Sequence, residues 1–211
     1  LTIDGPGGSG KGTISAQIAQ LLGWHYLDSG ALYRLLGIAA RRAAVSTSDA
    51  AGLLELLERI NIRFEASDGS VWLSDEEVST ELRQEAAGTL ASEVAEVPAV
   101  RQALLARQQQ FRQLPGLVAD GRDMGTVVFP DAMLKVFLTA SPQERANRRY
   151  KQLIAKGENV SLPRLLEDIE ERDERDSSRE VSPLVPAEDA IIIDSTATPI
   201  AEVFALVMQK V

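Results

Sequence analysis

A glycine-rich segment lies close to the first residue of this chain. Residues 5–13 read GPGGSGKGT, follow a short apolar run and precede a stretch of helical character. The spacing G-x4-G-K is typical of a loop that binds phosphate through backbone N–H groups, because glycine lets these groups turn inward without Cβ clashes. The helix that follows adds the donors of its own N-terminus. A turn that only caps a helix is the alternative, and the order strand, loop, helix favours the phosphate site.

The loop departs from the usual pattern directly after its lysine. The expected serine or threonine, whose hydroxyl ordinarily binds Mg²⁺, is replaced by Gly12, and Thr13 comes one residue later. We therefore expect Mg²⁺ to be held mainly through ATP phosphates and water, and we assign no protein ligand to it. Lys11 is expected to reach the β- and γ-phosphates. The residues predicted to bind ATP are Gly5, Pro6, Gly7, Gly8, Ser9, Gly10, Lys11, Gly12 and Thr13.

Composition excludes several other classes of protein. The net charge of −9 argues against nucleic-acid polymers and anionic membranes as partners. The absence of cysteine excludes disulfides and thiolate chemistry, and the single histidine, His25, disfavours a histidine-based triad or metal cluster. No apolar run approaches the length of a membrane span. We expect a cytoplasmic monomer that acts on small molecules, and a short natural leader before Leu1.

Strand and helix patterns alternate along the chain. Short apolar runs predict strands at 1–4, 25–27, 117–120, 134–138 and 191–194. Helical periodicity lies between them, at 12–22, 32–43, 100–112, 142–156 and 162–175. Such alternation predicts an α/β fold with a five-stranded parallel sheet flanked by helices, which binds ligands at the carboxyl ends of the strands.

One region breaks this alternation. Residues 61–73 read NIRFEASDGSVWL, two alternating β segments around a turn signal at residues 67–70. A helical stretch follows at 81–96. We interpret the first part as a small antiparallel insert within a single domain.

Three further motifs carry charged and hydroxyl side chains. Residues 27–34 read LDSGALYR, in which Ser29 could cap a helix. Residues 119–126 read ADGRDMGT and place Arg122 just beyond a buried strand. Residues 171–179 read ERDERDSSR, with Arg172, Asp176 and Arg179 on one helical face. A solvated, salt-bridged helix is the alternative for the last motif.

These four motifs, in this order, resemble bacterial-type cytidylate kinases, members of the P-loop nucleoside monophosphate kinase superfamily. The resemblance covers nearly the whole chain, and that family carries an antiparallel insert in its monophosphate-binding region. It implies phosphoryl transfer from ATP, with Mg²⁺, to CMP or dCMP. It further implies one kinase domain over 1–211, with a core at 1–60, 98–145 and 180–211, a monophosphate-binding insert at 61–97 and a helical lid at 146–165.

The resemblance also assigns roles to individual residues. Those implied in catalysis are Lys11, Arg122, Arg148 and Arg149, the last two on the lid helix that begins near Arg145. The implied CMP-binding residues are Ser29, Tyr33, Arg34, Ser92, Arg101, Asp120, Arg122, Asp123, Arg172, Asp176 and Arg179. Within this set, Arg34, Arg122 and Arg179 match phosphate-binding positions. Ser92, Arg101 and Asp123 match positions that read cytosine.

Chemical logic is consistent with these roles. Fixed guanidinium groups offset the repulsion between a monophosphate dianion and ATP. Asp123 can accept from the amine of cytosine, whereas uracil would leave a buried carboxylate without a donor. By sequence alone, Arg34 and Ser92 would be ordinary helix-surface residues. Asp120 could hold a magnesium-bound water or simply cap a turn.

Two other readings remain open from the sequence. The chain could be another small P-loop kinase, acting on UMP or on a non-nucleotide acceptor such as shikimate. Alternatively, it could be an ATP- or GTP-binding switch that modulates a partner, although no Asn/Thr-Lys-x-Asp guanine signature is present. A purely structural protein would have no use for the phosphate loop.

Overall fold

The computed structural model describes residues 1–64 and 70–211. The chain forms two compact units. The first consists of Leu1–Asp28 and Gln108–Val211, and the second of Ser29–Arg107. None of the helices in these described ranges is long and apolar enough to cross a membrane.

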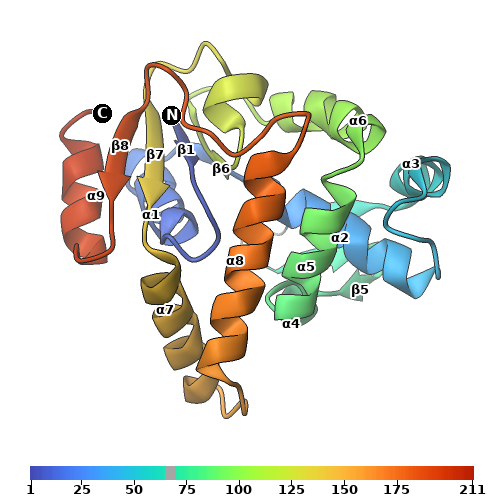
Figure 1. Cartoon of the computed structure of the whole chain (residues 1–211). Helices are drawn as coiled ribbons and strands as arrows, with labels where there is room; N and C mark the ends of the chain where they lie inside the picture. The colour runs from blue at the N-terminus through green and yellow to red at the C-terminus, as the bar shows by residue number, and fades with distance from the viewer. Residues whose placement is uncertain (65–69) are drawn as a thin grey trace. The chain divides into compact units, whose positions relative to one another are not determined.

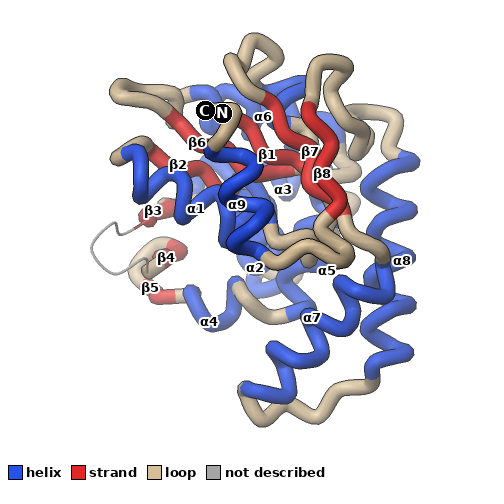
Figure 2. The backbone as a smooth tube through the Cα atoms, turned by 90° about the vertical axis from the view of Figure 1, so that its left-hand side faces the viewer, coloured by secondary structure: helices blue, strands red, loops and turns tan. Residues whose placement is uncertain are grey.

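The first unit is built on a parallel sheet of five strands (Figure 2). The strands are β1 (Thr2–Asp4), β2 (His25–Asp28), β6 (Leu117–Gly121), β7 (Lys135–Thr139) and β8 (Ile191–Asp194), in the order β2-β6-β1-β7-β8. Every strand lies within one residue of its predicted bounds. The central strand β1 pairs Ile3 with Asp120 on one side and with Val136 on the other. The ends of β1 and β6 therefore bring the glycine-rich loop and residues 120–123 to the same edge of the sheet.

Four α-helices complete the first unit: α1 (Lys11–Leu22), α7 (Pro142–Ala155), α8 (Leu162–Ser178) and α9 (Ile200–Met208). Ile14 and Ile18 of α1 and Val203 of α9 are buried in one apolar cluster with sheet residues such as Ile3 and Val136. The helices α7 and α8 run side by side, as Figure 1 shows. Burial of these apolar side chains holds the phosphate loop against a rigid sheet.

The second unit combines helices with a small antiparallel sheet. Its helices are α2 (Ser29–Arg42), α3 (Ala50–Arg59), α4 (Ser79–Leu82), α5 (Glu85–Val94) and most of α6 (Pro98–Gln109). The strands β3 (Ile62–Phe64), β4 (Val71–Leu73) and β5 (Glu76–Glu77) pair in that order, antiparallel. Leu35 and Ile38 of α2 pack in one core with Val71 and Leu73 of β4. The antiparallel insert is thus confirmed, while the turn signal at 67–70 falls mostly outside the described residues.

Several elements differ from the sequence-based prediction. The single helix expected at 81–96 is two helices, α4 and α5, separated by Arg83 and Gln84. Ser29 is the first residue of α2 and not the residue before it. The helices α3 and α9 were not predicted, and neither was a π-helical turn, η1 (Met124–Val128). The expected insert at 61–97 lies within the second unit, and its role in binding a monophosphate stays a prediction.

Candidate active site

The glycine-rich loop connects β1 to α1 in a conformation that only glycine permits. A Cβ atom added to Gly5 would lie 2.0 Å from the backbone oxygen of Leu138 in β7, so the loop passes directly against the sheet. Gly8 has φ of 78°, in the left-handed region that a side chain disfavours. The loop is therefore held close to the strands with its backbone accessible, as a phosphate cradle requires.

Lys11 lies at the first turn of α1, in a buried charged environment. Its Nζ donates to the backbone oxygen of Pro6 at 3.3 Å and lies 3.9 Å from Oδ1 of Asp120. Burial, reinforced by the nearby charge of Arg122, lowers the pKa of Lys11, while burial raises the pKa of Asp120. An anionic phosphate brought to this site would favour the charged form of Lys11 again.

The position of Asp120 explains why residue 12 is glycine. A Cβ atom at Gly12 would lie 3.0 Å from Oδ2 of Asp120. The same oxygen accepts a hydrogen bond from the Tyr26 hydroxyl at 3.2 Å, which fixes the carboxylate in place. A serine or threonine side chain at position 12 would thus displace Asp120.

Three arginines surround one buried carboxylate next to the loop. Asp176 of α8 is 3% exposed, and its Oδ2 accepts from Nε of Arg122 at 2.8 Å. Nε of Arg172 and Nη1 of Arg179 each lie 4.0 Å from the same carboxylate. Arg179 is the residue just beyond the last turn of α8 and not part of the helical face. We call these four residues the arginine cluster.

The arginine cluster changes the acidity of its carboxylate. Burial alone would raise the pKa of Asp176, but the positive charges of Arg122, Arg172 and Arg179 outweigh it and lower the pKa to about 2. Because this pKa lies below its unfolded value, the ionised form stabilises the fold above the unfolded pKa, and that contribution is lost as the pH falls through the folded value.

Asp176→Asn is therefore expected to destabilise the protein at neutral pH and to do so much less near pH 2. The unfolding free energy of the two proteins should differ by about 2 kcal/mol less near pH 2 than at neutral pH, as the lowered pKa of Asp176 requires. Urea unfolding of both proteins at the two pH values measures it. Asp168→Asn, which alters an exposed carboxylate of the same helix, is the matched control. If the parent protein and Asp176→Asn differ in unfolding free energy by the same amount at both pH values, the lowered pKa of Asp176 is contradicted.

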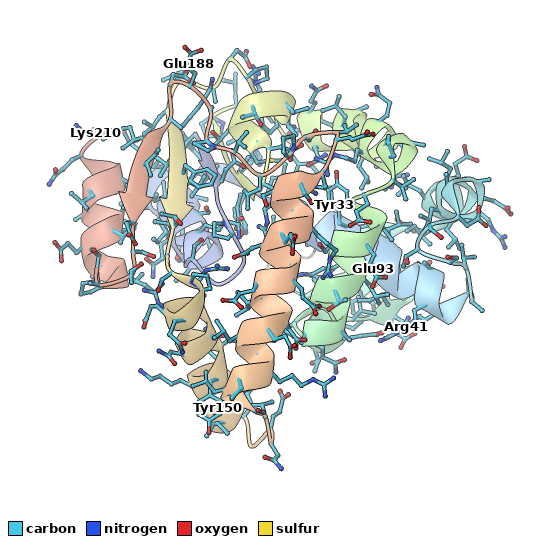
Figure 3. The ribbon with its side chains drawn as sticks, in the orientation of Figure 1. Tyr33, Arg41, Glu93, Tyr150, Glu188 and Lys210 are labelled. Atoms are coloured by element: carbon cyan, nitrogen blue, oxygen red, sulfur yellow. The ribbon has the colours of Figure 1, made fainter. Side chains whose placement is uncertain are left out.

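The arginines of α7 differ in their surroundings. The helix begins at Pro142 after Ser141, whose hydroxyl accepts from the N–H of Glu144. Arg145 is 2% exposed and donates to protein oxygens, so it does not project outward beside its neighbours. Arg148 and Arg149 are half-buried and lie just before Tyr150, which Figure 3 labels near the far end of α7.

The second unit carries a separate group of predicted site residues. Arg101 is 7% exposed, and its guanidinium lies 5.6 Å from the centre of the ring of Tyr33, which Figure 3 labels. Arg34 donates to the backbone oxygen of Leu82 at 3.4 Å. Ser29 and Ser92 are both buried. The structure thus places Arg101 and Tyr33 together, and it places Ser92 inside the unit and not on a helix surface.

Four residues that contact the predicted site were not found from the sequence. Asp173 pairs with Arg145, Ser195 binds the phosphate loop, and Tyr26 binds Asp120. Asp4 accepts from the N–H groups of Met124 at 2.8 Å and Gly125 at 2.7 Å. Only Asp4 had a usable signal, as an acidic residue that ends a buried strand. Its burial raises its pKa to about 7.

A glycine-rich loop with a largely buried lysine, set between the first strand and helix of a parallel sheet, defines a P-loop protein that handles phosphorylated ligands. The arginine cluster beside the loop is suited to a second phosphate.

The chain belongs to the cytidylate kinase family, whose profile matches residues 1–211. It is 56% identical to the cytidylate kinase of Stutzerimonas stutzeri, over 100% of this chain and 94% of that protein. It is 55% identical to the Pseudomonas aeruginosa enzyme and 53% identical to that of Klebsiella pneumoniae, in each case over 99% of this chain and 93% of the relative. A crystal structure of TT1252 from Thermus thermophilus covers 100% of this chain and 96% of its own, at 16% identity and a TM-score of 0.44, too distant to bear on function.

Proposed function

We propose that this protein transfers the γ-phosphoryl group of ATP to CMP or dCMP, giving ADP and CDP or dCDP. One observation carries the proposal beyond family membership: the arginine cluster adjoins the phosphate loop. A Cβ atom on Gly7 would lie 3.6 Å from Nη2 of Arg122 and 3.7 Å from Nη1 of Arg172. Guanidinium groups are thus fixed beside the loop, where an acceptor phosphate must meet the donor phosphates.

Catalysis in this scheme is alignment and charge neutralisation. The acceptor phosphate is already ionised, so its oxygen attacks the γ-phosphorus in line without a strong general base. Lys11 follows the charge that develops on the β- and γ-phosphates. Arg122 and Arg179 hold the acceptor phosphate, and Arg148 and Arg149 approach the transferred group. The loop of residues 5–13 binds the donor triphosphate.

The site suits a Mg²⁺ ion that is held mainly by the phosphates of ATP. Among residues 1–64 and 70–211, no group of three or more histidine or acidic side chains could hold a metal ion. We assign Asp120, which is paired with Lys11 and lies beside Gly12, to a water of Mg²⁺. Mg²⁺ bound to ATP would neutralise the phosphate oxygens as charge moves between them.

The remaining residues would recognise the nucleoside. We assign Ser92, Arg101 and Asp123 to the base, with Asp123 accepting from the cytosine amine. Arg172 and Asp176 are assigned to the ribose hydroxyls, and Arg34 joins the phosphate-binding arginines. Ser29 and Tyr33 complete the acceptor side. The buried state of Asp123 and Ser92 supports readout by hydrogen bonds, because such bonds are stronger where water is excluded.

An acceptor panel tests the proposal. The purified protein is assayed for ADP release from ATP with CMP, dCMP, UMP and shikimate. Preference for CMP or dCMP supports the cytidylate reading. Turnover only with another acceptor would favour a different small P-loop kinase, and ATP binding without any acceptor-dependent turnover would favour a switch.

Asp123→Ala is expected to narrow the preference for CMP over UMP by about tenfold or more, because the penalty for an unpaired carboxylate is removed. The ratio of kcat/KM for the two acceptors measures the effect. Asp131→Ala, which alters an exposed carboxylate of the same unit, should leave the ratio as it is. Unchanged selectivity in Asp123→Ala would count against base readout at this position.

A further inference from the structure

Arg145 joins three separate segments of the first unit. From its place in α7, its Nε donates to the backbone oxygen of Ala140 at 2.9 Å. Its Nη1 donates to the backbone oxygen of Gly7 at 3.0 Å and to Oδ1 of Asp173 in α8 at 3.0 Å, and its Nη2 donates to the other carboxylate oxygen of Asp173. The phosphate loop is therefore bound, through one buried guanidinium, to a carboxylate on another helix.

Ser195 binds a second carbonyl of the same loop. It follows the last residue of β8 and is buried. Its hydroxyl lies 3.0 Å from the backbone oxygen of Ser9 and 3.0 Å from that of Thr139. Nη1 of Arg148 lies 3.2 Å from this hydroxyl and 3.5 Å from the Ser9 oxygen. Donors from outside the loop thus hold the carbonyls of both Gly7 and Ser9.

Because the peptide bond is planar, a contact that fixes the direction of a carbonyl also fixes the direction of the next N–H group. In a trans peptide, the carbonyl of one residue and the N–H of the next point to opposite sides. With the carbonyls of Gly7 and Ser9 turned toward Arg145 and Ser195, the N–H groups of Gly8 and Gly10 point away from them. Within the part of the chain that the structure describes, these two N–H groups donate to no protein acceptor.

The loop sequence does not impose this arrangement by itself. Gly7 and Gly8 are adjacent, and Gly8 and Gly10 have φ of 78° and 97°. Glycine adopts either sign of φ with little steric cost, so the peptides that precede Gly8 and Gly10 can turn over. The direction of the N–H groups must then be set by the groups that bind the carbonyls.

We propose that Asp173, acting through Arg145, and Ser195 are positioning residues that fix the direction of the phosphate-loop N–H groups and thereby set its affinity for the donor triphosphate. Asp173 pairs with the guanidinium of Arg145 and holds it turned toward Gly7. Ser195 binds the carbonyl of Ser9 through an uncharged hydroxyl. The inference rests on the proposed function, because it assigns the loop to the triphosphate of the donor.

Two variants test the two contacts separately. Asp173→Asn keeps the size of the side chain but removes the charge that holds Arg145, and Ser195→Ala removes only the hydroxyl. Each has a matched control. Asp168→Asn removes an exposed charge from the same helix, and Thr198→Ala removes a hydroxyl that binds the backbone of Asp194 and not the phosphate loop.

Calorimetric titration with ATP, in the absence of any acceptor, is the main measurement. Each of the two variants should raise the ATP dissociation constant about tenfold, the effect of losing one hydrogen bond to a charged ligand. The KM for CMP should change by much less, and the two controls should match the parent protein. In protein labelled with ¹⁵N-glycine, the shifts of Gly8 and Gly10 on addition of ADP should be reduced in both variants.

An unchanged ATP dissociation constant in folded Asp173→Asn and Ser195→Ala, with only a lower unfolding temperature, would overturn the proposal, because the contacts would then be structural alone. An equal loss of affinity for ATP and CMP would overturn it as well. If Asp173→Asn does not fold, Ser195→Ala decides, since it leaves no buried charge without a partner. Failure of the parent protein to phosphorylate CMP would refute the proposed function and leave the ATP titration valid.

Discussion

Arg122→Ala is expected to lower kcat/KM for CMP by about 10²–10³-fold, while the dissociation constant for ATP stays close to that of the parent protein. Arg122 reaches the loop at Gly7 and donates to Asp176. Because the pairing with Asp176 uses Nε, the Nη2 group on the side of Gly7 is the one that binds the acceptor phosphate in the proposed reaction. Steady-state kinetics with varied CMP, together with ATP titration, measures the two effects independently.

Two companion variants sharpen the result for Arg122. Arg122→Lys keeps the positive charge but not the planar fork, so it should recover only part of the lost activity. Arg164→Ala, at an exposed position of α8, should behave like the parent protein. A comparable loss of ATP affinity in Arg122→Ala would show that this arginine serves the donor and not the acceptor.

Lys11→Met is expected to reduce kcat by about 10²-fold or more, because methionine preserves the length of the side chain but supplies no charge to the transferring phosphoryl. Stability should not fall in parallel, since burial already disfavours the lysine charge. Turnover and the unfolding temperature should be measured on the same preparation. Lys151→Met, at an exposed position of α7, is the control.

The result for Lys11→Met distinguishes two ways in which the loop could act on phosphate. Retained turnover would mean that the loop binds phosphate through its backbone alone. Lost turnover with ATP still bound would assign Lys11 to the transfer step itself.

The sheet was predictable because its signal is local. Each strand is a short apolar run that ends in a small or acidic residue, and burial on the sheet requires that composition. The helix α3 was missed although Asp49 caps it by accepting from the N–H of Gly52, since the preceding polar residues resemble a loop. The turn η1 depends on Asp4, which is more than a hundred residues away in sequence, so no local pattern announces it.

In the candidate site, too, some residues can be predicted from the local sequence and others only from how distant segments pack. Arg122 stands out in the sequence because it follows a buried strand, and Asp176 because it shares a helical face with Arg172. Asp173 does not, because it lies among alternating acidic and basic residues, a pattern that a solvated helix also carries. Which carboxylate meets Arg145 is decided by how α7 and α8 pack, and that information is distributed over both helices.

The close approach of Gly12 and Asp120 links two positions that are distant in sequence. A chain that gained a hydroxyl side chain at position 12 would have to give up or reposition the aspartate, and a chain that lost the aspartate would gain room for one. Among related proteins, we therefore expect the identities at these two positions to vary together. The oxygen proposed to hold a water of Mg²⁺ would then come from position 120 or from position 12. An engineered protein that moves this oxygen from one position to the other should need both substitutions at once.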